Sequence, residues 1–337
     1  MFTVNTTDIM HILSDYGIKD KIVDTNELLR YDYSDESQEV RVIIKCMFEN
    51  HNAVIIKFKW ESDVTAELIE AQTRFSEHLA ENGVHTARFH KCGGNYVKKY
   101  TLNGYDVLVT IEDFVENEIK IVTPDIAEKT GRTLAITHNI AERDDMHVDA
   151  PVLFDPFAEW NDLFSYDIFA ELKEKFPAND APAFDEAEKL YKMHMDKLET
   201  LKNRPKYAIQ GDISDCNLFI ATDGTVGMFD FNRCGDAVLF CDVIMQGVFE
   251  SQLMDYDREL TPEYTDELFN AFLRGYESKR LITDEEKALI PHFCAIIYAF
   301  WLGNIRWGDE SMTSLLEKGD IDGARKLLHR SLARLRK

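Results

Sequence analysis

An acid, an amide and a second acid follow one another at fixed intervals within residues 207–232. Asp212 comes first, Asn217 follows it, and Asp230 comes after two short apolar runs. Thr222-Asp223-Gly224 joins these runs and is typical of a hairpin turn. A hairpin would return Asp230 to the edge at which Asn217 lies, where two oxygen ligands could share Mg²⁺. The stretch therefore predicts a strand, a turn and a strand with polar side chains at the open end.

The same residues carry a family resemblance. Residues 210–217 read Gln-Gly-Asp-Ile-Ser-Asp-Cys-Asn, and Phe follows Asp230. This resembles the aminoglycoside phosphotransferase and choline kinase superfamily, small-molecule relatives of the protein kinases, which usually reads His-Gly-Asp-x-x-x-x-Asn and then Asp-Phe or Asp-Trp. The resemblance implies that Asp212 is catalytic and that Asn217 and Asp230 bind Mg²⁺. Gln210 replaces the family's usual His, a scaffold residue of the loop, and Gln can also donate and accept hydrogen bonds.

The length of the chain favours two lobes. A chain of 337 residues is too long for one small core. The resemblance implies an α+β, two-lobed protein-kinase-like fold, with a small N-terminal lobe of antiparallel sheet and a helix, and a larger, mainly helical C-terminal lobe. It places the nucleotide-binding lobe in residues 1–113 and the catalytic and acceptor-binding lobe in residues 114–337.

Hydrophobic periodicity and turn signals predict the individual elements. Strands are expected at 22–33, 39–48, 53–60, 95–100 and 105–111. Helices are expected at 5–20 (with Thr6 or Thr7 as its start and Gly17 as its stop), 63–80, 124–138, 184–203, 242–252, 261–278, 284–304, 312–318 and 322–336.

The third strand carries the candidate phosphate-binding cation. The resemblance implies a strand lysine that holds the nucleotide's α and β phosphates, and Lys57, which follows Ile55-Ile56, is our candidate. Lys59 has the same strand parity and is the alternative. The family pairs this lysine with a glutamate early on the next helix. Glu70 fits that role best, and Glu67 lies on the same helix face.

Two further segments bear on nucleotide binding. The resemblance implies that backbone groups near Asp113 to Val115, where the chain crosses between the lobes, bind the adenine edge. The family often has a small-residue turn over the phosphates, because glycine lets backbone N–H groups approach closely. Here the turn at 33–38 contains no glycine and two acids.

Three other features have structural as well as functional interpretations. His138 is interpreted as a packing histidine on a helix face. Asp242 opens a helix and is expected to hold backbone N–H groups near the active-site loop. The aromatic and acidic patch at 154–164 either packs on the core or helps to form an acceptor pocket suited to cations.

Composition narrows the range of partners. Lys plus Arg total 38 against 61 Asp plus Glu, and the net charge of −23 disfavours nucleic acid and anionic membranes. The acidity favours a cationic acceptor, although an acidic surface also serves solubility. No apolar run reaches the roughly 18–20 residues of a membrane span, the start lacks a signal-peptide pattern, and the cysteines form no C-x-x-C pair. We therefore expect a cytoplasmic protein; the sequence indicates no oligomeric state.

The resemblance thus implies a phosphotransferase that uses Mg²⁺ and moves the γ-phosphate of ATP, with GTP as the alternative donor, to a hydroxyl of a small molecule. Aminoglycosides, choline or ethanolamine, homoserine and amino sugars all stay open as acceptors. The rival interpretation is a nucleotide-binding relative without catalysis, which Gln210 and the glycine-free turn motivate. A kinase of proteins is disfavoured because no Ala-Pro-Glu follows Asp230.

Overall fold

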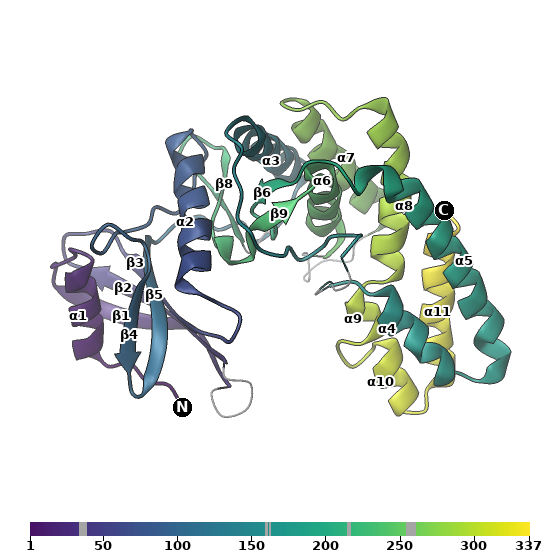
Figure 1. Cartoon of the computed structure of the whole chain (residues 1–337), viewed down its shortest axis with the longest axis horizontal. Helices are drawn as coiled ribbons and strands as arrows, with labels where there is room; N and C mark the ends of the chain where they lie inside the picture. Colours follow the sequence, from purple (N-terminus) through teal and green to yellow (C-terminus); the bar gives the residue numbers. More distant parts are fainter. Residues whose placement is uncertain (34–38, 159–160, 162, 214–216, 254–260) are drawn as a thin grey trace.

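The structure is a computed structural model of the chain. It describes residues 1–33, 39–158, 161, 163–213, 217–253 and 261–337. A strand-rich N-terminal lobe and a helical C-terminal lobe lie side by side along the longest axis (Figure 1). The N-terminus lies at one end of the sheet, and the C-terminus lies on the far side of the helical lobe. The predicted α+β, two-lobed fold is confirmed.

The N-terminal lobe is built on one five-stranded antiparallel sheet with the order β1-β2-β3-β5-β4. Its strands are β1 (Ile22–Tyr33), β2 (Glu39–Phe48), β3 (Val54–Trp60), β4 (Lys98–Leu102) and β5 (Tyr105–Asp113). Helices α1 (Thr6–Asp15) and α2 (Ala66–Glu81) also belong to the described part of this lobe. The last strand ends at Asp113, where the sequence places the boundary between the lobes.

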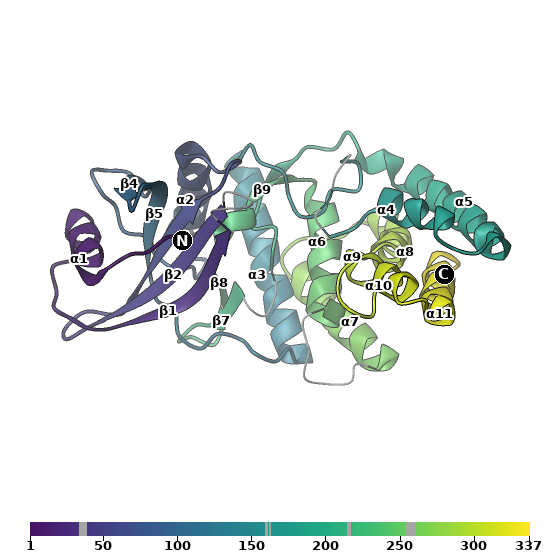
Figure 2. The ribbon, with the colours of Figure 1, turned by 90° about the horizontal axis from the view of Figure 1, so that it is seen from below.

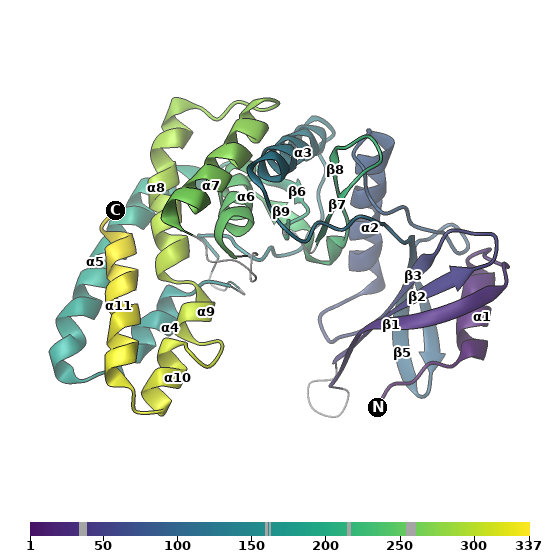
Figure 3. The ribbon, with the colours of Figure 1, turned by 180° about the vertical axis from the view of Figure 1, so that it is seen from behind.

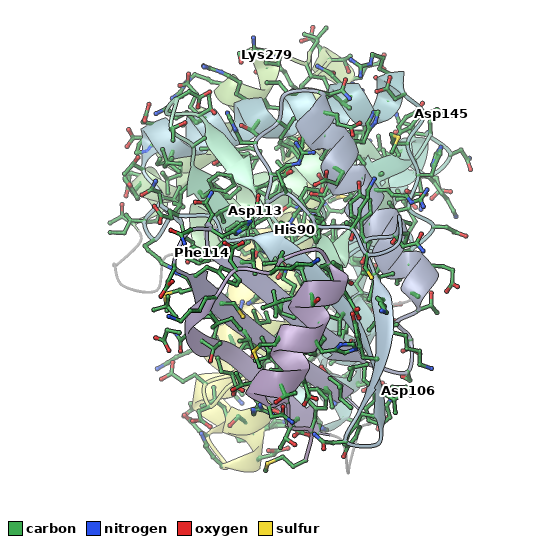
Figure 4. The ribbon with its side chains drawn as sticks, turned by 90° about the vertical axis from the view of Figure 1, so that its left-hand side faces the viewer. His90, Asp106, Asp113, Phe114, Asp145 and Lys279 are labelled. Atoms are coloured by element: carbon green, nitrogen blue, oxygen red, sulfur yellow. The ribbon has the colours of Figure 1, made fainter. Side chains whose placement is uncertain are left out.

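The two faces of this sheet differ because side chains alternate along each strand. Helix α1 covers the outer face, as Figure 4 shows from that side. Apolar side chains of that face form a core with α1, among them Val42, Ile44, Ile56, Phe58 and Val109. The alternate positions of β2, β3 and β5 include charged side chains and line a cavity on the inner face.

Helix α2 and the segment after it connect the lobes. The helix stands between the sheet and the C-terminal lobe in opposite views (Figures 1 and 3). The N–H of Met228, in the second lobe, donates to the carbonyl of His85 over 2.9 Å, and Thr86 forms a parallel bridge with Met228. A segment that precedes β5 in the chain therefore takes part in the architecture of the C-terminal lobe.

The C-terminal lobe combines helices with two small antiparallel sheets, and seen from below its helical end lies opposite the five-stranded sheet (Figure 2). Its larger helices are α3 (Pro124–Arg143), α5 (Ala181–Leu198), α6 (Leu239–Val248), α7 (Pro262–Glu277), α8 (Asp284–Ala299) and α11 (Ile321–Leu335). Shorter helices are α4 (Tyr166–Glu171), α9 (Leu302–Ile305) and α10 (Met312–Glu317). Strands β6 (Tyr207–Ile209) and β9 (Gly235–Ala237) form one pair, and β7 (Leu218–Ile220) and β8 (Val226–Met228) form the other.

Helices α3 and α7 approach closely because glycines face each other across their contact. A Cβ on Gly131 would lie 2.0 Å from the carbonyl oxygen of Phe272, and one on Gly275 would lie 1.8 Å from that of Glu128. Neither position accepts a side chain without moving a backbone. Helix α3 also contacts the β7–β8 hairpin, because the Thr133 hydroxyl donates to the carbonyl of Val226 in β8 over 2.9 Å. The α3–α7 pair therefore packs against the hairpin through α3.

Several predicted boundaries differ from the structure. Helix α1 ends at Asp15, close to Gly17, which the sequence predicts as its stop and which has a left-handed φ of 81°. The helix predicted at 242–252 begins at Leu239, and the one predicted at 284–304 divides into α8 and α9. Among the described residues no helix has the length and apolar character needed to cross a membrane.

Candidate active site

The hairpin brings Asn217 and Asp230 to the same end of two paired strands. β7 and β8 pair with Leu218 opposite Met228, and the Phe229 N–H donates to the Asn217 carbonyl over 3.0 Å, which extends the ladder beyond the strands. Gly224, in the turn, has a φ of 81°. The hairpin predicted from the sequence is present, and its open end carries both predicted metal ligands.

Asp212 lies beside Asn217 in the loop after β6. The Asn217 side-chain amide donates to the Asp212 carbonyl over 2.8 Å and to Asp212 Oδ2 over 3.0 Å. Burial, and then the negative charge of Asp230, raise the pKa of the Asp212 carboxyl. The structure thus brings the predicted catalytic acid and both predicted metal ligands together. Ser214 to Cys216, inside the loop, lie outside the described residues.

Lys57 bridges the sheet and this hairpin. Its Nζ lies 3.1 Å from Asp230 Oδ1 and 2.9 Å from Glu112 Oε1, on β5. Burial opposes the charge on Lys57, but the two carboxylates outweigh it and raise the lysine pKa. Burial alone would raise the pKa of Asp230, and the Lys57 cation reverses this and lowers it. Asp230 is therefore held as a carboxylate, which suits a metal ligand.

The predicted pair between Lys57 and Glu70 is not formed. Glu70 Oε2 instead accepts the backbone N–H groups of Tyr96 and Val97, over 2.8 and 3.1 Å, and Oε1 accepts from Arg74 over 3.2 Å. Helix α2 therefore presents Glu70 to the segment that leads into β4 and away from the lysine. Glu67, the alternative, is exposed.

Glu112 takes the place that the sequence assigned to Glu70. Ile55 and Glu112 are direct partners across β3 and β5, so Glu112 is the diagonal neighbour of Lys57 on the same face. Burial raises the pKa of Glu112, while Lys57 opposes this increase. Its Oε2 is buried and accepts no hydrogen bond from a described residue. The signal in the sequence was the strand parity of residue 112, which becomes informative only once the pairing of β3 with β5 is known.

Gln210 is hydrogen-bonded to the backbone of both segments that carry the site acids. It is fully buried; its Nε2 donates to the carbonyls of Phe229 and Asp230, over 3.2 and 2.9 Å, and its Oε1 accepts the N–H of Asp212 over 2.7 Å. Asp230 has a left-handed φ of 55°, which is strained for a residue other than glycine. The Gln210 amide thus joins the segment of the catalytic acid to the strained segment of the metal ligand.

A chain of buried polar groups holds the same loop from the other side. The Ile213 N–H donates to Gln246 Oε1 over 2.9 Å, and Gln246 Nε2 donates to Asp242 Oδ1 over 2.8 Å. Asp242 Oδ2 also lies 2.9 Å from His138 Nε2, and the other nitrogen of His138 lies 2.8 Å from the Tyr276 hydroxyl. Asp242 therefore supports the loop through Gln246 rather than directly, which corrects the prediction. His138 packs inside the lobe.

The connection between the lobes presents few free backbone donors. The Asp113 N–H donates to the Arg88 carbonyl over 2.8 Å and the Phe114 N–H to the Ala53 carbonyl over 2.9 Å, whereas the Val115 N–H donates to no described residue. Asp113 Oδ1 lies 2.9 Å from His90 Nε2. His90, Asp113 and Phe114 are labelled in Figure 4. Of the two predicted adenine contacts, Val115 is therefore the one that can donate.

The predicted acceptor patch and the predicted phosphate turn are only partly described. Phe154 and Phe164 are buried and pack edge to face with ring centres 4.9 Å apart, and Asp155 pairs with Lys206 over 2.6 Å. These contacts favour the core-packing interpretation for this part of the patch. Residues 159, 160 and 162 of the patch, and residues 34–38 of the turn, lie outside the described residues.

The donor set at the hairpin fits a divalent cation. Within the described ranges no group of three or more His, Cys, Asp or Glu side chains converges on a metal-sized site. Mg²⁺ does not need one, because it usually binds one or two protein oxygens together with phosphates and water. Asp230 supplies a carboxylate, and the donation from Asn217 Nδ2 to Asp212 leaves Asn217 Oδ1 as a second oxygen.

Comparison with known proteins finds one matching family model and a curated protein with a short match. The model of the family described as "Phosphotransferase enzyme family" matches residues 49–282, which is more than half of the chain. An uncharacterized protein of Deinococcus radiodurans is 28% identical over 96 residues, which cover 28% of this chain and 27% of that protein. The match thus spans about a quarter of the length of that relative.

Solved structures share the fold at low sequence identity. An amicoumacin kinase in complex with AMP-PNP, Ca²⁺ and its ligand has a TM-score of 0.60 at 16% identity, over 89% of this chain and 88% of that one. A microcompartment-associated aminopropanol kinase has a TM-score of 0.63 at 16% identity, over 98% and 95%. A spectinomycin phosphotransferase in complex with ADP and spectinomycin has 0.55 at 11%, over 98% of each chain. The chain has a small-molecule-kinase fold and belongs to the phosphotransferase enzyme family.

Proposed function

We propose that this phosphotransferase moves the γ-phosphate of ATP to the hydroxyl of a small, amino-bearing molecule. The convergence of Asp212, Asn217 and Asp230 at one end of the hairpin, with Lys57 bound to Asp230 over 3.1 Å, carries the proposal. An acid, two oxygen ligands and a cation at one place are the parts that phosphoryl transfer requires.

Asp212 is the residue that we assign to the acceptor hydroxyl. Its Oδ2 accepts from Asn217, so Oδ1 can accept the hydroxyl proton or orient it. The raised pKa of Asp212 makes it a stronger base than an exposed carboxylate. Lys57 binds phosphate oxygens, and the ion pair with Glu112 holds the lysine side chain on the inner face of the sheet.

Asn217 and Asp230 would hold Mg²⁺, which when bound neutralises charge on the phosphates. The transition state of phosphoryl transfer is loose, so catalysis depends on positioning and on electrostatic stabilisation. Gln210 contributes to positioning, because it connects the backbones of Asp212 and Asp230. This observation favours an active enzyme over the rival nucleotide-binding relative without catalysis.

The proposed acceptor class rests on the net charge of the chain and on the named substrates of proteins with the same fold. The net charge of −23 favours the approach of cations. One protein of the same fold is named an aminopropanol kinase, and another is named a spectinomycin phosphotransferase. Amino alcohols, amino sugars and aminoglycosides therefore form the first panel to test.

The experiment is an ATP-consumption screen over that panel, with ATP and GTP as donors, followed by mass analysis of each product. We expect one acceptor class to gain a single phosphoryl group in a reaction that requires Mg²⁺, and Asp212→Asn to slow the formation of that product by two orders of magnitude or more. Mg²⁺-dependent ATP binding without a phosphorylated product across the panel would instead support the rival interpretation.

A further inference from the structure

A cavity of about 110 Å³ lies on the inner face of the sheet, between β2, β3, β5 and α2. Three cations line it, Arg41 on β2 and Lys57 and Lys59 on β3. Arg41 pairs directly with Lys59 across the strands, as Ile43 does with Lys57. Asp230 also lines this cavity, so it adjoins the proposed metal site.

The three cations differ in how well they are neutralised. Lys57 contacts two carboxylates within 3.1 Å. Arg41 holds Glu61 with two hydrogen bonds of 2.7 and 2.9 Å. Lys59 lies 3.8 Å from the same Glu61, too far for a hydrogen bond, although its side chain is only 19% exposed.

Lys59 is therefore a largely buried cation without a hydrogen-bonded anion among the described residues. Burying such a charge is costly unless a counter-charge reaches it. Burial lowers the pKa of Lys59, and the nearby carboxylate only partly offsets this. In a protein with 61 acidic residues, a largely buried cation at the wall of a cavity, whose carboxylate partner lies 3.8 Å away and is already hydrogen-bonded to Arg41, indicates a site for an anionic ligand.

The position of Lys59 indicates which anion this is. Lys57 and Lys59 stand two residues apart on one strand face, which is roughly 6.6 Å. Arg41 and Lys59 are paired near the first residues of β2 and the last residues of β3, and residues 34–38, which precede β2 in the sequence, contain no glycine. A glycine turn would supply backbone N–H groups to phosphates. In this chain the side-chain cations of β2 and β3 can supply the compensating charge.

We propose that Lys59, flanked by Arg41, is a second phosphate-binding cation that contacts the terminal phosphates of the nucleotide beside Lys57. The inference rests on the nucleotide site proposed above. It assigns two residues that the family motif does not require, and it explains how a chain without a glycine turn holds a triphosphate. Because the contact is with the terminal phosphates, its contribution depends on the number of phosphates in the ligand.

The test is the affinity of wild type and Lys59→Gln for ATP, ADP and AMP, measured by calorimetry with Mg²⁺. A hydrogen bond to a charged group supports a loss of about tenfold or more for ATP. AMP affinity stays within about threefold, since AMP lacks the contacted phosphates. Lys59→Arg keeps the charge and retains most of the ATP affinity. Lys99→Gln removes an exposed lysine of the same lobe and serves as the matched control, with no change expected.

Each outcome separates the claims. Equal affinity of wild type and Lys59→Gln for ATP, or an equal loss for ATP and AMP, would overturn the role of Lys59 while leaving the proposed function intact. A wild-type chain that binds no nucleotide would refute the nucleotide site and the inference with it. If Lys59→Gln does not fold, Arg41→Gln takes its place, and it too must weaken ATP more than AMP.

Discussion

Gln210 gives the sharpest test of how the site is held together. In Gln210→Met a side chain of similar size replaces the amide, and the variant loses three hydrogen bonds, to the carbonyls of Phe229 and Asp230 and from the N–H of Asp212. At about 1 kcal/mol each, these bonds contribute roughly 3 kcal/mol to the free energy of unfolding. The side chain is fully buried, so water cannot replace them.

The substitution is expected to lower turnover because it displaces Asp230, since Gln210 itself takes no part in the reaction. Without the amide, the strained backbone of Asp230, with its φ of 55°, loses the bond that holds its carbonyl. A shift of about 1 Å in a reacting group costs on the order of 100-fold in rate. We therefore expect Gln210→Met to lower the melting temperature and to reduce kcat by about that factor.

The matched variant is Gln210→His. An imidazole keeps one acceptor and one donor, so it can still bond the Asp212 N–H and one carbonyl. We expect this variant to lose only about 1 kcal/mol of stability and to keep kcat within about tenfold of wild type. Thermal unfolding and steady-state kinetics measure both quantities. Wild-type stability and kcat in Gln210→Met would refute the reasoning.

Three further predictions concern other parts of the molecule. Gly131→Ala, whose Cβ would lie 2.0 Å from the Phe272 carbonyl oxygen, lowers the free energy of unfolding by about 1–3 kcal/mol in thermal or chemical unfolding, and an unchanged value would contradict the close helix contact. Glu112→Gln removes the carboxylate bonded to Lys57 and raises KM for ATP by about tenfold, whereas Glu70→Gln leaves KM within about twofold of wild type. A larger increase of KM in Glu70→Gln than in Glu112→Gln would show that Glu70 is the functional partner of Lys57, as the sequence predicts. The raised pKa of Asp212 keeps its carboxyl protonated, and so inactive as a base, to a higher pH than usual. As the pH is lowered, kcat/KM therefore begins to fall with an apparent pKa above the ordinary aspartate value of about 3.9. An apparent pKa at or below that value would contradict the role of Asp212.

Local patterns explain why much of the fold was predictable. The alternation along β2, β3 and β5 separates the α1 core from the inner face, and the Asp-Gly turn sets the hairpin that joins Asn217 to Asp230. These features depend on residues close together in the chain. Strand parity likewise put Lys57 and Lys59 on one face before the structure placed both in the cavity wall.

Contacts between distant segments could not be predicted in the same way. Glu70 and Glu112 are both acids of the N-terminal lobe, and the choice between them as the partner of Lys57 depends on the rotation of α2 and on the register of β3 with β5. The bonds of Gln210 and Gln246 require knowing which backbone groups lie opposite them. Sequence spacing alone contains neither kind of information.

The central claim is that Asp212 is the catalytic residue of phosphoryl transfer, and its most direct test compares wild type with Asp212→Asn on the acceptor that the screen identifies. The substitution keeps the shape of the side chain and a carbonyl oxygen, but removes the base. We expect the kcat of the variant to fall by two orders of magnitude or more, the typical upper contribution being about 10⁴-fold, while its affinity for Mg²⁺-ATP stays near the wild-type value. Wild-type turnover by Asp212→Asn would contradict the account.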